Sequence, residues 1–362
     1  MSTTDEPLLE VRDLSVHFET EDGVVHAVDG VSHTIHKGES LGIVGESGSG
    51  KSVTMLTVMG LTKSPNAKIS GEILFEGRNL LEASGEEMRR IRGNDIAMIF
   101  QDPLSSLHPF YRVGRQLVEG IRTHQKVSKA AARDRAIELL DLVGIPNPKE
   151  RAQQYPHEYS GGMRQRAMIA MALSNDPKLL IADEPTTALD VTVQAQILEL
   201  IARLREELGM AVALITHDLG VVAEVTDHIT VMYAGQVVES APIGTIFRAP
   251  EHPYTWGLLR SIPRLDRVRG EALIPVAGRP PSMISPPNGC RFHPRCPYVQ
   301  PAHTRVVPDL VRGEGTDHEV RCLLVSETRK RLWSELDMGK TPDQIVKAVP
   351  IETRATEEEA PA

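Results

Sequence analysis

The stretch from Leu41 to Ser52, LGIVGESGSGKS, constrains the fold of this chain more than any other. An apolar run typical of a buried strand passes into a glycine-rich loop, and the residues from Ser52 to Gly60 have helical character. In such a loop the backbone N–H groups turn inward to bind phosphate, the lysine reaches the β and γ phosphates, and the hydroxyl binds Mg²⁺. We therefore predict that a nucleotide binds here, to Gly45, Glu46, Ser47, Gly48, Ser49, Gly50, Lys51 and Ser52.

Net charge and cysteine content narrow the range of partners. The formal charge of −9 disfavours nucleic acid or an acidic membrane surface as a general partner. The N-terminus has no basic region followed by an apolar core, and no run approaches the roughly 20 apolar residues that span a bilayer, so we expect a cytoplasmic protein. Three cysteines, Cys290, Cys296 and Cys322, do not make a disulfide framework, which leaves reduced thiols or metal ligands.

Two acidic residues end the predicted buried strand Lys178 to Glu184, KLLIADE. A parallel strand with carboxylates at its C-terminal end is typical of a ligand site in an α/β sheet. We predict that Asp183 anchors Mg²⁺ and that Glu184 is the general base that activates the attacking water. Taken alone, these acids could equally belong to a turn or cap a helix.

Gln101 and His217 also follow predicted strands, Asp95 to Gln101 and Ala211 to Thr216. Gln101 is predicted to contact Mg²⁺ or the attacking water, and His217 to donate a hydrogen bond to the γ-phosphate and that water. The simpler alternatives are an exposed loop amide and a structural histidine. Near the start of the chain, Phe18 could stack on adenine, although an aromatic residue near a strand end is more often core.

A second phosphate-binding geometry lies in a helical insertion between about Tyr111 and Ala172. Ser160, Gly161 and Gly162 open a helix there, so their N–H groups and the helix dipole face outward. A single γ-phosphate would not need two phosphate-binding helix N-termini from the same chain. A later amphipathic helix, from Asp190 to Leu208, has Asp190 as its predicted N-cap.

The order of the motifs resembles the ATPase subunits of ATP-binding cassette (ABC) transporters. The resemblance runs from Leu8 to about Glu239 and includes the ALD stretch that ends at Asp190. It implies an α/β fold: a P-loop ATPase core with a RecA-like parallel sheet, an antiparallel β subdomain and a helical subdomain. It also implies that ATP and Mg²⁺ are bound, that Ser160, Gly161 and Gly162 complete the site of a partner subunit, and that Asp190 lies at the dimer interface.

A finer resemblance is carried by IFQDPLSSLHP, ITHDLGVVAEVTDHITVMYAGQVVE, FRAPEHPYTWGLL and GCRFHPRCPY. These stretches are similar to the ATPase subunits of bacterial dipeptide and oligopeptide importers. The likeness implies a second ATPase subunit, expected to be a paralogue, two transmembrane permease subunits and an extracytoplasmic peptide-binding protein. It places the chain peripherally on the cytoplasmic face of the inner membrane.

The chain departs from the family pattern at a few positions. Tyr159 stands where leucine is usual, Met163 where glutamine is common and His108 where asparagine is frequent, but none of these removes a phosphate-contacting group. Similar family members often carry four cysteines near the C-terminus as iron–sulfur ligands. This chain has three, with His303 at the expected place of another ligand and His293 as a rival.

Three thiolates and an imidazole could hold a [4Fe–4S] cluster or Zn²⁺. The alternative, of equal weight, is that Cys290, Cys296, Cys322 and His303 carry no metal.

We predict three parts of the chain: an ATPase domain at 1–240 with a helical subdomain at about 102–172, an extension at 241–335 with the cysteines, and a tail at 336–362. The extension is expected to be rich in loops because eight prolines lie between Pro250 and Pro287. The tail is expected to be disordered from about Ile351. Two other functions compete with peptide import: a soluble cassette ATPase acting on DNA or ribosomes, and a metal- or redox-sensing protein regulated by ATP.

Overall fold

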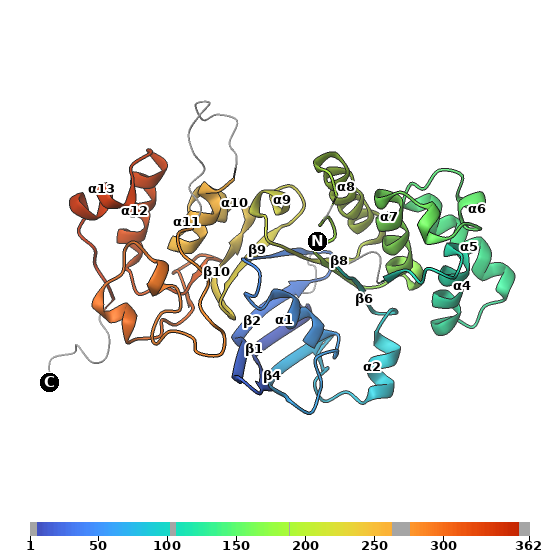
Figure 1. The fold of residues 1–362 in the computed structure, drawn as a ribbon, viewed down its shortest axis with the longest axis horizontal. Helices are drawn as coiled ribbons and strands as arrows, with labels where there is room; N and C mark the ends of the chain where they lie inside the picture. The colour runs from blue at the N-terminus through green and yellow to red at the C-terminus, as the bar shows by residue number, and fades with distance from the viewer. Residues whose placement is uncertain (1–5, 102–105, 188, 263–275, 355–362) are drawn as a thin grey trace.

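An eight-stranded sheet forms the centre of the molecule (Figure 1). The computed structural model describes residues 6–101, 106–187, 189–262 and 276–354. The expectations that involve residues 1–5, 102–105, Ala188, 263–275 and 355–362 therefore lie in part outside it. Five strands run parallel, and three more continue the sheet in antiparallel fashion. In sheet order they are β11 (Val311–Arg312), β12 (Glu319–Val320), β10 (Gln236–Pro242), β9 (His228–Tyr233), β3 (Ser40–Val44), β8 (Ala211–Thr216), β7 (Leu179–Asp183) and β6 (Ile96–Ile99).

The carboxyl ends of the central parallel strands lie level with one another. Val44 at the end of β3 pairs with Thr216 at the end of β8, and Asp183 at the end of β7 pairs with Ile215. β6 pairs alongside β7 and ends at Ile99. Residues that directly follow these four strands are therefore brought to one edge of the sheet.

The central strands are buried on both faces, as their continuous apolar runs predict. In β7, Leu179 and Ile181 pack into a core shared with a second sheet, whereas Leu180 and Ala182 face the opposite side. That second, antiparallel sheet contributes the core residues Leu9 and Val28, among others. It consists, in sheet order, of β2 (Gly23–His36), β1 (Pro7–Thr20), β4 (Ala67–Phe75) and β5 (Arg78–Asn79), with helices α1 (Lys51–Val58) and α2 (Gly85–Ile91) beside it.

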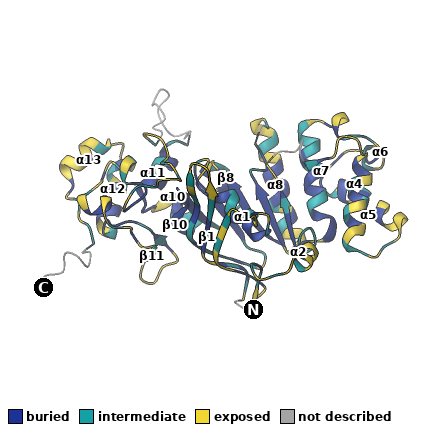
Figure 2. Cartoon of the chain, turned by 60° about the horizontal axis from the view of Figure 1, so that its bottom comes forward, coloured by how far each residue is buried: buried dark blue, intermediate teal, exposed yellow. Residues whose placement is uncertain are grey.

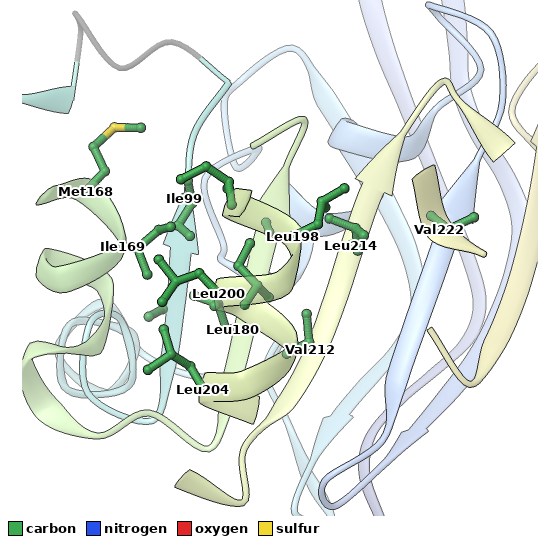
Figure 3. Close-up of a cluster of buried hydrophobic side chains, with 14 of the residues drawn as sticks. Ile99, Met168, Ile169, Leu180, Leu198, Leu200, Leu204, Val212, Leu214 and Val222 are labelled. Carbon is green, nitrogen blue, oxygen red and sulfur yellow. The ribbon is translucent and has the colours of Figure 1, made fainter. Parts of the chain in front are cut away.

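Helices α4 to α7 form a separate end of the molecule. Their apolar residues recur at helical spacing, as Val113, Leu117 and Ile121 do in α4, and these faces pack together. Figure 3 shows how this core joins the sheet through Ile169 and the neighbouring α8. The helices of this end are α4 (Val113–His124), α5 (Lys129–Leu142), α6 (Pro148–Arg151), η1 (Pro156–Glu158), α7 (Gly161–Ala172) and η2 (Leu173–Asn175). Helix α8 (Val191–Leu208) contacts α7, and α9 (Leu219–Val222) follows β8 and packs against it.

The C-terminal part is rich in loops between residues 276 and 325, as predicted, and helices lie on both sides of these loops. Its described residues include the α-helices α10 to α13 and two 3-10 helices, and β11 and β12 extend the central sheet at β10. Two prolines begin helices, since Pro253 and Pro342 occupy the first turn of α11 and α13, where no N–H is needed. These elements are α10 (Ile243–Arg248), α11 (Pro253–Arg260), η3 (His293–Arg295), η4 (Pro301–Thr304), α12 (Ser326–Asp337) and α13 (Pro342–Ala348).

Backbone hydrogen bonds hold the tail in place as far as Arg354, further than its composition predicts. Val325 N–H donates to the carbonyl of Glu352 at 3.1 Å, and Arg354 N–H donates to the carbonyl of Leu323 at 2.7 Å. Disorder from Ile351 is thus corrected as far as Arg354, and residues 355–362 lie outside the described part of the chain. Figure 2 shows buried strands in the middle and exposed residues on outer helices such as α5 and α13. No helix in the described ranges is long and apolar enough to cross a membrane.

Candidate active site

The loop between β3 and α1 leaves no room for side chains at two of its glycines. A Cβ at Gly45 would lie 2.1 Å from the carbonyl oxygen of Met232, and one at Gly50 would lie 2.5 Å from that of Ala27. Gly50 also has a φ of 100° and forms the N-cap of α1. The glycines therefore allow the loop to pack directly against neighbouring backbone and to enter the helix, as the motif predicts.

Lys51 is buried in this loop and folds back over it. Its Nζ donates to the carbonyl oxygens of Gly45 at 2.6 Å and Glu46 at 2.9 Å. Burial lowers the pKa of Lys51, while the carboxylates of Glu184, Asp183 and Glu46 act in the opposite direction. A cation in a partly desolvated loop of this kind is suited to binding an anionic phosphate.

Ser52 and Asp183 lie next to each other across the end of the sheet. The Ser52 hydroxyl donates to Asp183 Oδ1 at 3.0 Å, and burial raises the pKa of Asp183. A hydroxyl and a carboxylate are the oxygen ligands that Mg²⁺ prefers, and this ion usually keeps waters and substrate phosphates as its other ligands. The pair fits a shared Mg²⁺ site that a bound nucleotide would complete.

Glu184 is surrounded by hydrogen-bond donors. Gln101 Nε2 donates to Glu184 Oε2 at 3.0 Å, the Thr187 hydroxyl donates to the same oxygen at 2.8 Å, and His217 Nδ1 lies 3.3 Å from Oε1. Burial acts to raise the pKa of Glu184, but the hydrogen bonds from Thr187 and His217 outweigh it and the pKa is lowered. Gln101, Glu184 and His217, predicted from three separate strands, are thus brought together.

The backbone of Glu184 is strained. Its φ of 45° is uncommon for a residue with a side chain, and its N–H donates to the carbonyl of Ile215 at 2.9 Å. Thr187 was missed in the sequence, where its only signal is a hydroxyl three residues after the glutamate. The chain turn that follows β7 therefore sets both the direction of the carboxylate and one of its partners.

Ser160 caps α7 by accepting a hydrogen bond from Met163 N–H at 3.3 Å, and its side chain is exposed. Gly162 lies against α8, where an added Cβ would be 3.1 Å from Val193 Cγ1. Asp190 caps α8 through Val193 N–H at 3.0 Å, as predicted. Among the described residues no hydrogen bond joins 160–162 to the loop at 45–52, so within this chain the two phosphate-type ends are not connected.

Phe18 lies on β1, paired with Val25 of β2 and Ala67 of β4. It is half-buried and packs against the core between the two sheets. This packing covers only part of the Phe18 ring and does not show whether the rest contacts a ligand. The contact of Phe18 with adenine stays a prediction.

The cysteine prediction receives no support. In the parts of the chain that are described, no group of three or more His, Cys, Asp and Glu side chains is arranged to hold a metal. Burial raises the pKa of all three thiols, which disfavours the thiolate form that binds metals. His303 Nδ1 is engaged with Gln300 N–H at 3.1 Å. Neither an iron–sulfur cluster nor Zn²⁺ follows from this arrangement of Cys290, Cys296, His303 and Cys322.

Comparisons with known proteins agree with the geometry. Residues 28–187 match the family described as "ABC transporter", and residues 238–302 match "Oligopeptide/dipeptide transporter, C-terminal region". The oligopeptide transport ATP-binding protein OppD of Bacillus subtilis is 51% identical over 324 residues, which are 89% of this chain and 90% of that protein. The dipeptide transport ATP-binding protein DppD of the same organism is 53% identical over 321 residues, 88% and 95% of the two chains.

Solved structures show the same fold. A dimeric ATP-binding cassette with bound ADP and Pi, in a post-hydrolysis state, has a TM-score of 0.58 at 29% identity, covering 65% of this chain and 98% of that one. A component of an ABC transporter complex from Clostridium perfringens has a TM-score of 0.59 at 29% identity, covering 68% and 92%. The predicted α/β fold class is confirmed.

Proposed function

Because this chain belongs to the ATP-binding proteins of oligopeptide and dipeptide ABC transporters, we propose that it hydrolyses ATP at the edge formed by β3, β6, β7 and β8 to drive peptide import. The observation that carries the site assignment is the convergence of residues far apart in sequence. Lys51 and Ser52 meet Asp183 and Glu184, and Glu184 in turn meets Gln101 and His217. The competing functions on DNA, on ribosomes or as a metal sensor receive no support from the comparisons.

The residues divide the reaction between them. The N–H groups of the loop and Lys51 hold the β and γ phosphates, and Ser52 and Asp183 would hold Mg²⁺, which neutralises developing charge on the phosphates. Water attacks the γ-phosphorus and gives a proton to Glu184, a new P–O bond forms, and the bond to the ADP oxygen breaks. His217 and Gln101 orient the carboxylate and the water.

Permease subunits require a docking surface, and the junction between the sheet and the helical end offers one. A hollow of about 640 Å³ lies there, lined mainly by apolar side chains such as Met98, Met168 and Met171. Phe100 and Leu61 in its lining are 41% and 47% exposed. An apolar segment of a permease would cover these side chains, including Phe100, the residue that precedes Gln101, and so links the membrane subunit to the residue that contacts the catalytic water. This contact gives the chain its peripheral place at the membrane.

A second ATPase subunit completes the assembly. The exposed Ser160 and the glycines that follow it are free of the loop in their own chain, which supports their use on the nucleotide of a partner. We also propose that Asp190, which caps the neighbouring helix α8, lies at the interface between the two ATPase subunits. In this proposal the partner is a paralogue, and substrate reaches the permeases from an extracytoplasmic peptide-binding protein.

Replacing the general base tests the proposed chemistry. Glu184→Gln keeps the size and one hydrogen-bond acceptor but cannot take the proton, so ATP binding persists while turnover falls by about 10² to 10⁴-fold. The measurement is phosphate release by the assembled transporter, with ATP binding followed in parallel. Lys51→Ala serves as the contrast, because it loses binding as well. Near-normal turnover in Glu184→Gln would refute the assignment.

A further inference from the structure

Arg295 is held in one geometry by all five of its donor hydrogens. Nη1 donates to Glu46 Oε2 at 2.6 Å and to Tyr233 Oη at 3.3 Å, and Nη2 donates to Glu46 Oε1 at 3.0 Å. The remaining donors reach the carbonyls of Ala277 at 2.8 Å and Val276 at 3.2 Å. The side chain is only 4% exposed. A guanidinium that is fully bonded and nearly buried fixes the carboxylate that it binds.

That carboxylate belongs to the phosphate loop. Glu46 follows Gly45 directly, and its side chain is 29% exposed. Its backbone N–H donates to Tyr254 Oη at 2.9 Å, and Tyr254 lies fully buried against Tyr233 with ring centroids 4.7 Å apart. Both the side chain and the backbone of Glu46 are therefore held by residues from outside the loop and its flanking strand and helix.

A second arginine, Arg291, supports the other side of the loop indirectly, through the turn between β9 and β10. Arg291 hydrogen-bonds the carbonyl of Ala234 and pairs with Asp29 on β2. Ala234 lies in the turn between β9 and β10, and the next residue, Gly235, donates its N–H to the carbonyl of Ser49 at 3.0 Å. Two arginines four residues apart thus brace the loop at its beginning and near its end.

We propose that Arg295, with Arg291 and Tyr254, positions the phosphate loop, so that the C-terminal region is part of the ATP site and not an appendage to it. The inference rests on the proposed function and adds positioning residues to it. A loop that is ordered before ATP arrives loses less conformational entropy on binding, which favours tight binding. None of the three residues contacts Glu184 or His217 through a hydrogen bond in the described chain, so the effect belongs to nucleotide binding and not to the chemical step.

The test compares Arg295→Met with wild type in the full-length chain, using a fluorescent ATP analogue and Mg²⁺. We expect the Kd to rise on the order of tenfold, which corresponds to about 1.4 kcal/mol of binding free energy. In the assembled transporter KM for ATP rises while kcat stays close to wild type, the pattern of lost binding without lost chemistry. Arg279→Met removes an exposed arginine of the same region and leaves Kd unchanged.

A double-mutant cycle separates positioning from general loss of structure. Glu46→Gln alone also weakens binding, and adding Arg295→Met to it has little further effect, because the two side chains act as one pair. Thermal unfolding without nucleotide, measured for each variant, reports folding separately. Additive effects on Kd, or an unchanged Kd in folded Arg295→Met, would overturn the inference. Lys51→Ala tests the ATP site separately from the positioning role of Arg295. Unchanged ATP binding in Lys51→Ala would refute the ATP site itself, whereas lost binding would support the site whatever the result for Arg295.

Discussion

The environment of Lys51 shows how single residues prepare the site for an anion. In the structure its ammonium bonds two backbone carbonyls, of Gly45 and Glu46, and is buried close to several carboxylates. Burial lowers the pKa of Lys51 because the charged form loses water, and the carboxylates limit that effect. The oxygens of a bound phosphate are charged acceptors for the Lys51 ammonium, and hydrogen bonds to charged acceptors are stronger than those to carbonyls.

Gly45 sets the shape of the loop at the same scale. In Gly45→Ala the added Cβ would meet the Met232 carbonyl, a backbone atom that cannot rotate away, so the loop must shift. We expect ATP affinity to fall by about tenfold or more, since even a displacement of about 1 Å disrupts oriented contacts. Equilibrium binding of the ATP analogue measures this.

Gly38→Ala is the matched control. Gly38 has a φ of 73° but open space around its Cβ position. This change costs about 1 kcal/mol of backbone strain and leaves ATP affinity as it was. Equal losses of affinity in the two variants would mean that the close approach at Gly45 does not set the shape of the loop.

At the scale of elements, the start of α11 shows how the C-terminal region is locked to the sheet. His252 caps this helix, with Nδ1 accepting from Tyr254 N–H at 3.1 Å, and its own N–H donates to the buried Glu239 of β10 at 3.1 Å. Burial lowers the pKa of His252 to about 3, and the positive charge of Arg329 acts in the same direction. The capping nitrogen therefore stays unprotonated and able to accept.

This cap predicts a dependence of stability on pH. The unfolded histidine binds a proton below its ordinary pKa of about 6.5, whereas folded His252 does not until about pH 3, so stability is complete above 6.5 and is lost as pH falls. Between about pH 7 and pH 5 the loss from this residue is on the order of 2 kcal/mol. Urea unfolding at the two pH values measures it.

His252→Asn isolates this contribution. Asparagine can still cap the helix but does not titrate, so the free energy of unfolding should change less between the two pH values than in wild type. His33, whose pKa burial lowers to about 4, retains its own share of the slope in both proteins. Identical slopes in variant and wild type would contradict the role given to His252.

At the scale of the whole molecule, the sheet carries the C-terminal region on one edge and the helical end near the other (Figure 1). The pairing of β12 with β10 and the two arginine contacts to the loop and β2 tie the C-terminal region to the core. The helical end carries Ser160 at the exposed start of α7. The C-terminal region therefore holds the phosphate loop of this chain, whereas the start of α7, the second phosphate-binding geometry, remains available to another subunit.

Ser160→Arg tests this division. The larger side chain and the loss of the cap should block the composite site, so ATP turnover of the assembled transporter is lost. ATP binding by the isolated chain should stay within about twofold of wild type, because loss of an N-cap costs only about 1 kcal/mol within the helical end. If the isolated chain instead loses ATP binding as Lys51→Ala does, Ser160 belongs to its own chain's site.

Local rules were sufficient for much of the fold. The strands from 178 and 211 and the cap at Asp190 follow from apolar runs and capping residues close in sequence. The helices of the C-terminal region do not follow from such local patterns. A proline can end one element or begin another, and only packing decides which of these it does.

The sequence by itself determined the phosphate loop, the acidic pair after β7, and the order of motifs that assigns the family, since each depends on neighbouring residues along the chain. Only the tertiary structure decided that Arg295 and Tyr254 hold Glu46, that Thr187 joins Glu184, and that the cysteines and His303 form no metal-binding group in the described chain. The reason is physical: Glu46 meets Tyr254 and Arg295, 208 and 249 positions away, through strand pairing and core packing, and no local pattern along the chain records such contacts. Even Thr187, three residues from Glu184, reaches it only through the turn that follows β7.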